Sequence, residues 1–458
     1  MSTTLVLAVP LAARLRGLAM DEVETGGVIL ARLVRTPSGN IRLLARELIE
    51  VPDHAYERRG AQELLIRSDG YVPALALAEH GGCVPIWFHT HPGNGSSPAP
   101  SGHDLAVNQS LSDLFRLRAD SPFYGALIVG VEDGAVTFTG SLDDGCNITS
   151  IDRLWVVGPR LALYQAADAG QNDVPDLYDR NVRAFGGPVQ QVLGNLRVAV
   201  VGCGGTGSAV AEQLVRLGVR KIDLIDPDFL SDSNVTRVYG SRLADVGKPK
   251  VEVLAGHLSA VMPTVQISAV QSMITSEGTA RLLLDADVVF GCTDDNAGRM
   301  VLSRLATYLM VPVIDCGVLL SSDTRNHLDG IHGRVTVLHP GQACLICRGR
   351  VDLARARSEI LTAEERTRLV GEGYAPALPG VEPAVVAYTT AVAAAAVSEL
   401  IERLTHYGVE PVPSEVLLRL HDREISTNCQ EPLDRHYCHQ SAGKTGLGLT
   451  DPFLEQTW

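Results

Sequence analysis

Two histidines separated by a single residue follow an apolar run, as His89 and His91 in Trp-Phe-His-Thr-His-Pro. Alternate side chains of an extended chain face the same way, so both imidazoles could bind one ion. The segment Ser101-Gly-His-Asp104 comes next and offers Asp104 as a third ligand at the start of an expected helix. Three protein ligands leave the fourth tetrahedral position open for water, which is typical of a catalytic zinc ion.

Each of these residues also has a purely structural interpretation. Two histidines at this spacing are weak evidence for a metal when taken alone. Ser101 and Asp104 match a capping box, a device that begins a helix and carries no chemistry. Both interpretations can hold at once, with Ser101 capping the helix while Asp104 binds the ion. His103 is an alternative ligand.

The HTHP segment, the Pro-rich loop after it and the SxxD segment together resemble the JAMM (Mov34/MPN) metallopeptidases, and Glu24-Thr-Gly-Gly is similar to the family's upstream acidic segment. The zinc ligands that the resemblance implies are His89, His91 and Asp104. By the same resemblance Glu24 is the general base for the zinc-bound water, and Ser101 stabilises the tetrahedral oxyanion. Nine residues separate His91 from Ser101, more than is usual in the family, and the extra length lies in a Gly/Ser/Pro loop.

A second group of residues could bind a nucleotide. The glycines of the segment Gly-Cys-Gly-Gly-Thr-Gly, which follows the expected strand Val198–Val201, are Gly202, Gly204, Gly205 and Gly207. Glycine lets backbone N–H groups approach phosphates, and the N-terminus of the helix that follows favours negative charge. Asp226 ends the next strand, where its carboxylate can hold ribose hydroxyls. An NAD(P) dehydrogenase would explain this pattern equally well.

Polar and charged residues further along the chain favour ATP over a nicotinamide cofactor. They are Asp228, Asn234, Arg237, Lys250 and Asp294. An enzyme that splits a triphosphate needs cations on the leaving phosphates and carboxylates for magnesium, and a dehydrogenase needs neither. The order and spacing of the whole set therefore predict an ATP and Mg²⁺ site.

The same order resembles the ThiF/MoeB/ubiquitin-activating-enzyme family over roughly residues 175–405, through GCGGTGS, DPDxxxxSNxxR, GKPK, CTDDNxxR and the segment Leu-Tyr-Asp-Arg-Asn that contains Arg180. The resemblance implies that the four glycines cradle ATP and Asp226 binds the ribose. It also implies that Asn234, Arg237 and Lys250 bind the phosphates and that Asp294 binds magnesium. Arg180 would reach the ATP site of a second subunit in a homodimer. The implied reaction is attack of a protein C-terminal carboxylate on the α-phosphate.

The cysteines suggest a structural zinc site. Cys344-Leu-Ile-Cys347 is a metal-type pair at the position of the family's zinc knuckle. A second CxxC is absent, so Cys429 and Cys438 are the candidates to complete the site. Residues 348–428 contain no cysteine, and a stable thioester on this chain is therefore not expected. An odd total of nine cysteines without a secretion signal predicts reduced thiols and a cytoplasmic protein.

The elements that must position these residues fall into two patterns. Short apolar strands with one or two helices precede residue 145, which indicates an α+β domain. The strands expected there are Val28–Val34, Ile41–Glu50, Val84–Phe88, Ala126–Val131 and Ala135–Thr139. From Val198 onward strands alternate with helices, which predicts a doubly wound, mostly parallel Rossmann-like sheet. Its expected strands begin at Val198, Lys221, Val265, Val288 and Val311, and Val416–Leu420 adds one more.

The chain of 458 residues is too long for a single core. We expect a JAMM domain over residues 1–145, a helical connection with Arg180 over 146–195, an adenylation domain over 196–410, and a C-terminal strand and tail over 411–458. A formal net charge of -14 argues against nucleic acid or an anionic membrane as main partner. Residues 384–401 are expected to form a buried, Ala-rich helix and no membrane span.

The two chemistries fit one substrate. A ubiquitin-like or sulfur-carrier protein with a Gly-rich C-terminus must lose any further residues before its terminal carboxylate can be adenylated. The expectation is a bifunctional enzyme that trims this tail with zinc and then activates the carboxylate with ATP. One alternative is an activating enzyme whose first half removes the small protein from conjugates or only docks it. Another is an NAD(P)-dependent oxidoreductase.

Overall fold

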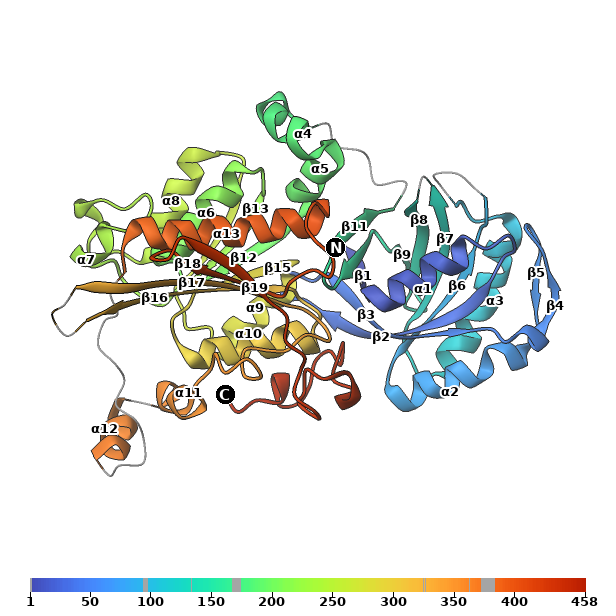
Figure 1. Ribbon diagram of the computed structural model, residues 1–458. Coiled ribbons are helices and arrows are strands. Elements are labelled where there is room, and N and C mark those ends of the chain that lie inside the picture. Colours follow the sequence, from blue (N-terminus) through green and yellow to red (C-terminus); the bar gives the residue numbers. More distant parts are fainter. Residues whose placement is uncertain are drawn as a thin grey trace. The chain divides into compact units, whose positions relative to one another are not determined.

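The computed structural model describes residues 2–93, 98–132, 134–166, 174–323, 325, 327–361, 363–371 and 384–458 (Figure 1). The chain divides into two compact units. The first comprises Met1–Asn172 and Gly446–Leu449, and the second comprises Asp173–Thr445 and Thr450–Trp458. Each unit has its own sheet and its own core.

The first unit contains a nine-stranded sheet in the order β11-β10-β1-β3-β2-β6-β7-β8-β9. Its strands are β1 (Thr3–Ala8), β2 (Gly26–Arg35), β3 (Ile41–Glu50), β6 (Val84–Thr90), β7 (Tyr124–Glu132), β8 (Ala135–Asp143), β9 (Ile148–Ser150), β10 (Arg153–Val157) and β11 (Ala162–Gln165). A separate two-stranded sheet pairs β4 (Tyr56–Arg59) with β5 (Leu64–Ile66). The strands expected from the sequence are thus confirmed, and several are longer than expected.

Side chains alternate across this sheet and build a core on each face. In β2, Ile29 joins one core with residues of α1 (Val9–Ala19), whereas Val28 and Leu30 join the other. The second core also contains residues of α2 (Val72–Gly81) and α3 (Gly102–Arg118). Helix α3 therefore lies against the sheet face to which Trp87 of β6 also points.

Two expectations about the end of the first unit are wrong. The sheet continues beyond residue 145, because β9 pairs with β8 in an antiparallel ladder. The segment expected to be helical begins instead with β10 and β11, and β10 pairs in parallel with β1. Such pairing has no local sequence signature, because β10 forms its hydrogen bonds with β1, the first strand of the chain. Helices α4 (Asp179–Phe185) and α5 (Gly187–Asn195) do lie at the end of that segment.

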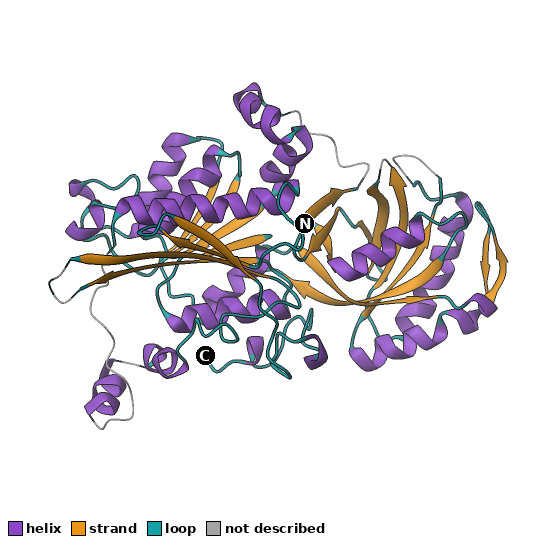
Figure 2. Cartoon of the chain, in the orientation of Figure 1, coloured by secondary structure: helices purple, strands orange, loops and turns teal. Residues whose placement is uncertain are grey.

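The second unit contains an eight-stranded sheet in the order β14-β13-β12-β15-β16-β17-β18-β19. Figure 2 distinguishes strands from helices by colour. The strands of this sheet are β12 (Arg197–Val201), β13 (Lys221–Ile225), β14 (Gln266–Val270), β15 (Val288–Gly291), β16 (Val313–Ser322), β17 (Leu328–Leu338), β18 (Glu415–Arg419) and β19 (Glu424–Asn428). The five strands from β14 to β16 are parallel, and those from β16 to β19 are antiparallel. The predicted doubly wound, mainly parallel sheet is confirmed for the first five.

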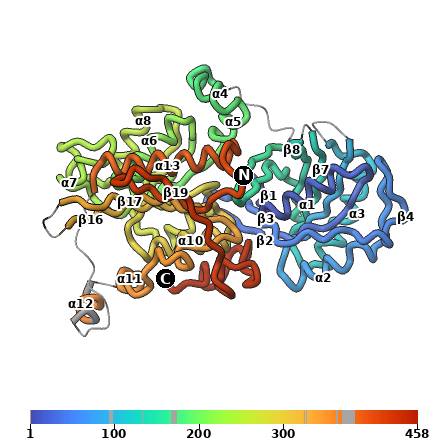
Figure 3. Tube along the Cα trace, viewed as in Figure 1, coloured from blue at the N-terminus to red at the C-terminus, as the bar shows by residue number. Residues whose placement is uncertain are grey.

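Helices pack against this sheet, and they can be followed along the chain trace in Figure 3. They are α6 (Gly205–Arg216), α8 (Lys250–Val261), α10 (Asn296–Tyr308) and α13 (Val386–Thr405), and a further helix, α9 (Glu277–Leu282), precedes β15. Helix α13 packs against α6, β16 and β17, and it is the Ala-rich helix expected to be buried. Within the described ranges, no helix combines the length and apolar character needed to cross a membrane.

Candidate functional sites

Three side chains of the first unit converge at the end of β6. Nε2 of His89 lies 3.1 Å from Nε2 of His91. Nε2 of His89 is 3.3 Å from one carboxylate oxygen of Asp104, and Nε2 of His91 is 4.0 Å from the other. The ligand atoms all lie within 4.8 Å of one another. Two imidazole nitrogens and a carboxylate oxygen that face one another suit a shared cation. His103 is exposed and does not belong to the group.

Asp104 occupies this position because Ser101 begins helix α3. The Asp104 N–H donates to Ser101 Oγ at 3.2 Å, and the Ser101 N–H donates to Asp104 Oδ2 at 2.7 Å. Burial alone would raise the pKa of Asp104, but hydrogen bonds from His89 and Ser101 outweigh it and hold that pKa well below its ordinary value. The capping box and the predicted ligand position therefore coexist. The predicted loop insertion falls partly on residues 94–97, outside the described residues.

Glu24 lies beside this group at the entry to β2. Burial raises the pKa of its carboxyl, the charge of His89 lowers it, and Asp104 raises it further. The β4–β5 hairpin holds the backbone of Glu24 on both sides. The Glu24 N–H donates to the carbonyl of Gly60 at 2.8 Å, and Arg59 Nε donates to the carbonyl of Glu24 at 3.0 Å. Arg59 Nη2 also donates to Thr25 Oγ1 at 2.5 Å.

The two glycines after Glu24 allow β2 to approach β6 closely. Gly26 pairs with His89 and Gly27 pairs with Phe88. A Cβ atom on Gly26 would lie 2.9 Å from the Trp87 ring, and one on Gly27 would lie 2.5 Å from the Phe88 ring. A larger residue at either position would push β2 away, and Glu24 with it. The Glu-Thr-Gly-Gly segment therefore has a packing reason for its glycines.

In the second unit, the predicted glycine loop joins β12 to α6. Gly202 has a φ of +92°, and a Cβ there would lie 2.6 Å from the carbonyl oxygen of Cys292. A Cβ on Gly207 would lie 1.8 Å from the carbonyl oxygen of Gly202, so only glycine lets the helix begin here. Gly204 faces open space, with no atom within 4 Å of its Cβ position. The loop thus leaves room for a ligand at the N-terminus of α6.

Asp226, at the end of β13, holds the glycine loop through a hydrogen bond to its backbone. Its Oδ2 accepts from the Cys203 N–H at 2.7 Å, and its Oδ1 accepts from the Asp228 N–H at 2.9 Å. Burial raises the pKa of Asp226, and the charge of Lys250 opposes that rise. Lys250 Nζ lies 2.7 Å from Asp228 and 3.9 Å from Asp226. The structure therefore brings Lys250 to the Asp226–Asp228 pair, from which it is separated by more than twenty residues of sequence.

The remaining predicted nucleotide ligands lie in three elements. Asn234 is buried in α7 (Asp232–Val235), and its Oδ1 accepts from the Ser231 N–H at 3.1 Å. Arg237 follows that helix, and its Cδ would lie 3.3 Å from a Cβ on Gly205. Asp294 is exposed directly before α10. Arg180 is exposed on α4 and has no ion pair with any described residue.

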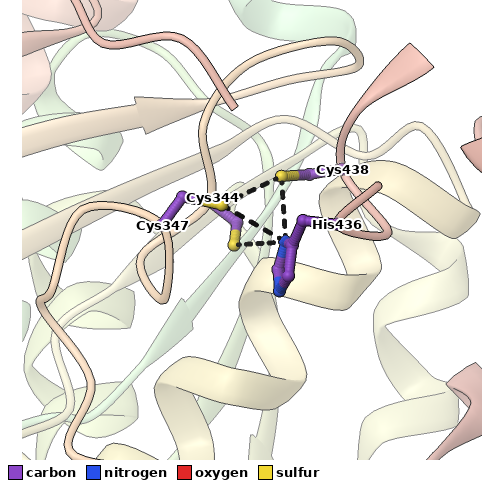
Figure 4. A group of neighbouring side chains, drawn as sticks. All are labelled: Cys344, Cys347, His436 and Cys438. Carbon is purple, nitrogen blue, oxygen red and sulfur yellow. Dashed lines mark hydrogen bonds between the residues drawn. The ribbon is translucent and has the colours of Figure 1, made fainter. Parts of the chain in front are cut away.

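Four side chains gather at the predicted zinc knuckle, as Figure 4 shows: Cys344, Cys347, His436 and Cys438. His436 Nδ1 lies 3.6 Å from Sγ of Cys344, 3.3 Å from Sγ of Cys347 and 3.2 Å from Sγ of Cys438. Cys429 is exposed and lies outside this group, so its predicted role as a ligand is wrong. A Cys₃His set suits a structural zinc ion, and all four side chains are wholly or partly buried.

Comparison with known proteins bears on this second unit. The model of the ThiF family matches residues 178–439, more than half of the chain. The chain belongs to the ThiF family. The glycine loop, the Asp226 and Lys250 group and the cysteine–histidine group all lie within the matched residues. The His89, His91 and Asp104 group lies before them.

Several known proteins are similar to part of the sequence. The chain is 30% identical over 178 residues to the molybdopterin-synthase adenylyltransferase of Escherichia coli, covering 38% of this chain and 68% of that protein. It is 31% identical over 160 residues to the sulfur carrier protein ThiS adenylyltransferase of the same organism, covering 34% and 60%. It is 38% identical over 118 residues to the tRNA threonylcarbamoyladenosine dehydratase 2 of Saccharomyces cerevisiae, covering 25% and 26%.

Sequence reasoning missed two residues of these sites. His436 was overlooked because only cysteines were considered as partners of Cys344 and Cys347, although a His-x-Cys pattern is visible at residues 436–438. Arg59 has no sequence signal. It is one of several arginines in a polar stretch, and only the folded hairpin brings it to Glu24.

Proposed function

We propose that this chain is a bifunctional enzyme that trims and then activates the C-terminus of a small carrier protein. The observation that carries the activating half is the glycine loop anchored on Asp226, with Lys250 and Asp228 beside it, in a member of the ThiF family. Two of its relatives are adenylyltransferases by name. A glycine loop at a helix N-terminus, a buried carboxylate and a lysine together suit a nucleoside triphosphate.

Each residue of this site has a separate task in the proposed reaction. The N–H groups at Gly204 and Gly205 hold phosphates, and Asp226 holds ribose hydroxyls. Lys250 and Arg237 offset the charge on the phosphates as pyrophosphate leaves, and the amide N–H of Asn234 donates a hydrogen bond to a phosphate oxygen. Magnesium bound at Asp294 would neutralise further phosphate charge. The carrier's terminal carboxylate attacks the α-phosphorus of ATP, and the products are an acyl-adenylate and pyrophosphate.

For the first unit we propose a zinc peptidase site. Its support is the convergence of His89, His91 and Asp104, with Glu24 beside them. Zinc would supply Lewis acidity that activates a water molecule and polarises the peptide carbonyl. Glu24 takes a proton from that water and delivers it to the departing amine. Ser101 lies one turn before Asp104 and stabilises the developing oxyanion.

The partner that fits both halves is a ubiquitin-like or sulfur-carrier protein with a Gly-rich C-terminus. Trimming exposes the carboxylate that adenylation requires, so the two sites would act in sequence on one molecule. We further propose a homodimer through the second unit, in which the exposed Arg180 reaches the partner's ATP. Reduced thiols at the cysteine–histidine group fit a cytoplasmic enzyme.

The test uses the full chain with ATP, Mg²⁺ and a panel of small carrier proteins that end in Gly-Gly followed by a reporter tail. Mass spectrometry follows loss of the tail, and ATP–pyrophosphate exchange follows activation. Tail loss without ATP is the expected result for the wild-type chain. In a His89→Ala, His91→Ala double variant, which should not trim, exchange is expected only with carriers that are supplied already trimmed. Exchange in that variant supported equally by untrimmed carriers would contradict the proposed order. Binding of NAD(P)H in place of ATP would contradict the adenylation half.

A further inference from the structure

The first turn of α10 is held by a carboxylate from a distant part of the chain. Glu359 lies on α11 (Leu353–Ile360), and its Oε2 accepts from the N–H groups of Asn296 at 2.7 Å and Ala297 at 2.9 Å. Its Oε1 accepts from Asn296 Nδ2 at 3.1 Å. One side chain thus satisfies three donors at the start of the helix that Asp294 precedes.

Asn296 in turn accepts a hydrogen bond from the backbone of α11, and Arg366 donates to the other end of that helix. The N–H of Asp352, which caps α11, donates to Asn296 Oδ1 at 2.9 Å. Arg366 donates to the carbonyl groups of Ser358 and Glu359 at 2.9 and 3.2 Å. Both ends of α11 are therefore fixed, and Asn296 is bound through its backbone and through both side-chain atoms.

Two carboxylates share the capping of α10. The side chain of Asp295 accepts from the Gly298 N–H, and Glu359 accepts from the N–H groups of the two preceding residues, Asn296 and Ala297. The first three N–H groups of the helix are thus all satisfied, and two of them depend on Glu359. The backbone that directly follows Asp294 is therefore fixed by a side chain from outside its own helix.

We propose that Glu359 is a positioning residue of the nucleotide site, which pins residues 293–297 so that Asp294 faces the magnesium of Mg-ATP. This inference rests on the proposed adenylation function. It links α11 to nucleotide binding. Glu359 touches neither ATP nor metal in this role and acts through Asn296 and the backbone.

The test measures binding of Mg-ATP and of AMP to the full-length protein by isothermal titration calorimetry. In Glu359→Ala, the dissociation constant of Mg-ATP should rise about tenfold, because three hydrogen bonds to a charged group are lost. Binding of AMP should not change, because AMP needs the glycine loop and Asp226 but no magnesium. Glu359→Gln keeps one acceptor oxygen and should recover part of the affinity. Glu364→Ala is the matched control, because Glu364 is an exposed carboxylate on α12 (Ala363–Gly371).

Hydrogen exchange gives a readout that does not depend on nucleotide binding. Backbone amides of residues 296–300 should exchange faster in Glu359→Ala than in wild type and in Glu364→Ala. Unchanged exchange there, or unchanged Mg-ATP affinity, overturns the inference. Equal weakening of Mg-ATP and AMP also overturns it, because that result indicates general loosening of the fold. A wild-type protein that binds neither nucleotide contradicts the adenylation function and overturns the inference with it, whereas a loss seen only in Glu359→Ala leaves the adenylation function standing.

Discussion

Nδ1 of His436 lies 3.2 Å from Sγ of Cys438, although the two residues belong to a segment that the sequence presents as a polar tail. A histidine and a cysteine at alternate positions can both turn toward the Cys344 and Cys347 pair. The geometry supports a Cys₃His zinc site in place of the four cysteines that the sequence suggested.

His436→Ala should therefore release about one zinc equivalent and lower the melting temperature, because a structural zinc site contributes directly to folding free energy. Cys429→Ser should change neither quantity, since Cys429 is exposed and outside the group. Zinc content by atomic absorption and thermal unfolding of both variants check this. Zinc loss in Cys429→Ser with full zinc in His436→Ala would reverse the assignment.

Replacing both His89 and His91 by alanine should remove the other zinc equivalent and abolish tail cleavage. ATP–pyrophosphate exchange with an already trimmed carrier should stay at the wild-type rate, because each unit has its own core and its own site. Loss of exchange in a folded double variant would show that the two activities are coupled.

Glu24→Gln keeps the shape of the side chain and should keep zinc, but it removes the proposed proton acceptor. We expect the cleavage rate to fall by about 10²–10⁴. Zinc analysis separates this effect from loss of the metal. Cleavage at the normal rate would exclude Glu24 as the base.

Arg59→Ala tests whether the β4–β5 hairpin positions Glu24. Loss of the hydrogen bonds to the Glu24 carbonyl and to Thr25 should lower the kcat of tail cleavage by about ten- to a hundredfold, with zinc content unchanged. Arg59→Lys keeps the charge without the planar fork and should recover part of the rate. Arg58→Ala is the control, because Arg58 pairs with the exposed Glu63 on the same hairpin. An equal loss in both alanine variants would point to the hairpin as a whole.

Arg180 and Asp294 can be tested in one mixture. A chain with both Arg180→Ala and Asp294→Ala has no activity of its own, because Asp294 is needed for magnesium. If Arg180 acts on the partner's ATP, the wild-type site of a mixed dimer faces a mutant arginine and is also inactive. Excess double mutant should then suppress ATP–pyrophosphate exchange per wild-type chain, once subunit exchange is verified. Undiminished activity would rule out action across the interface.

Local sequence was enough to predict most elements and the composition of both proposed sites. β12 and β15 consist almost entirely of apolar residues, and the glycine loop lies where β12 ends and a helix begins, so the order of residues alone carries the signal. The same holds for His89 and His91, which one strand turns to the same side. In these cases the interacting groups are neighbours in sequence, or they are placed by a single element.

The tertiary structure decided the contacts made between distant segments. The pairing of β10 with β1, the approach of Arg59 to Glu24, the choice of His436 over Cys429 and the hold of Glu359 on Asn296 all join such segments. Apart from the His-x-Cys pattern at residues 436–438, no local pattern predicts these contacts, because many side chains along the chain could make them equally well. Which of them do so depends on how the strands and helices pack, and that packing is a property of the whole chain.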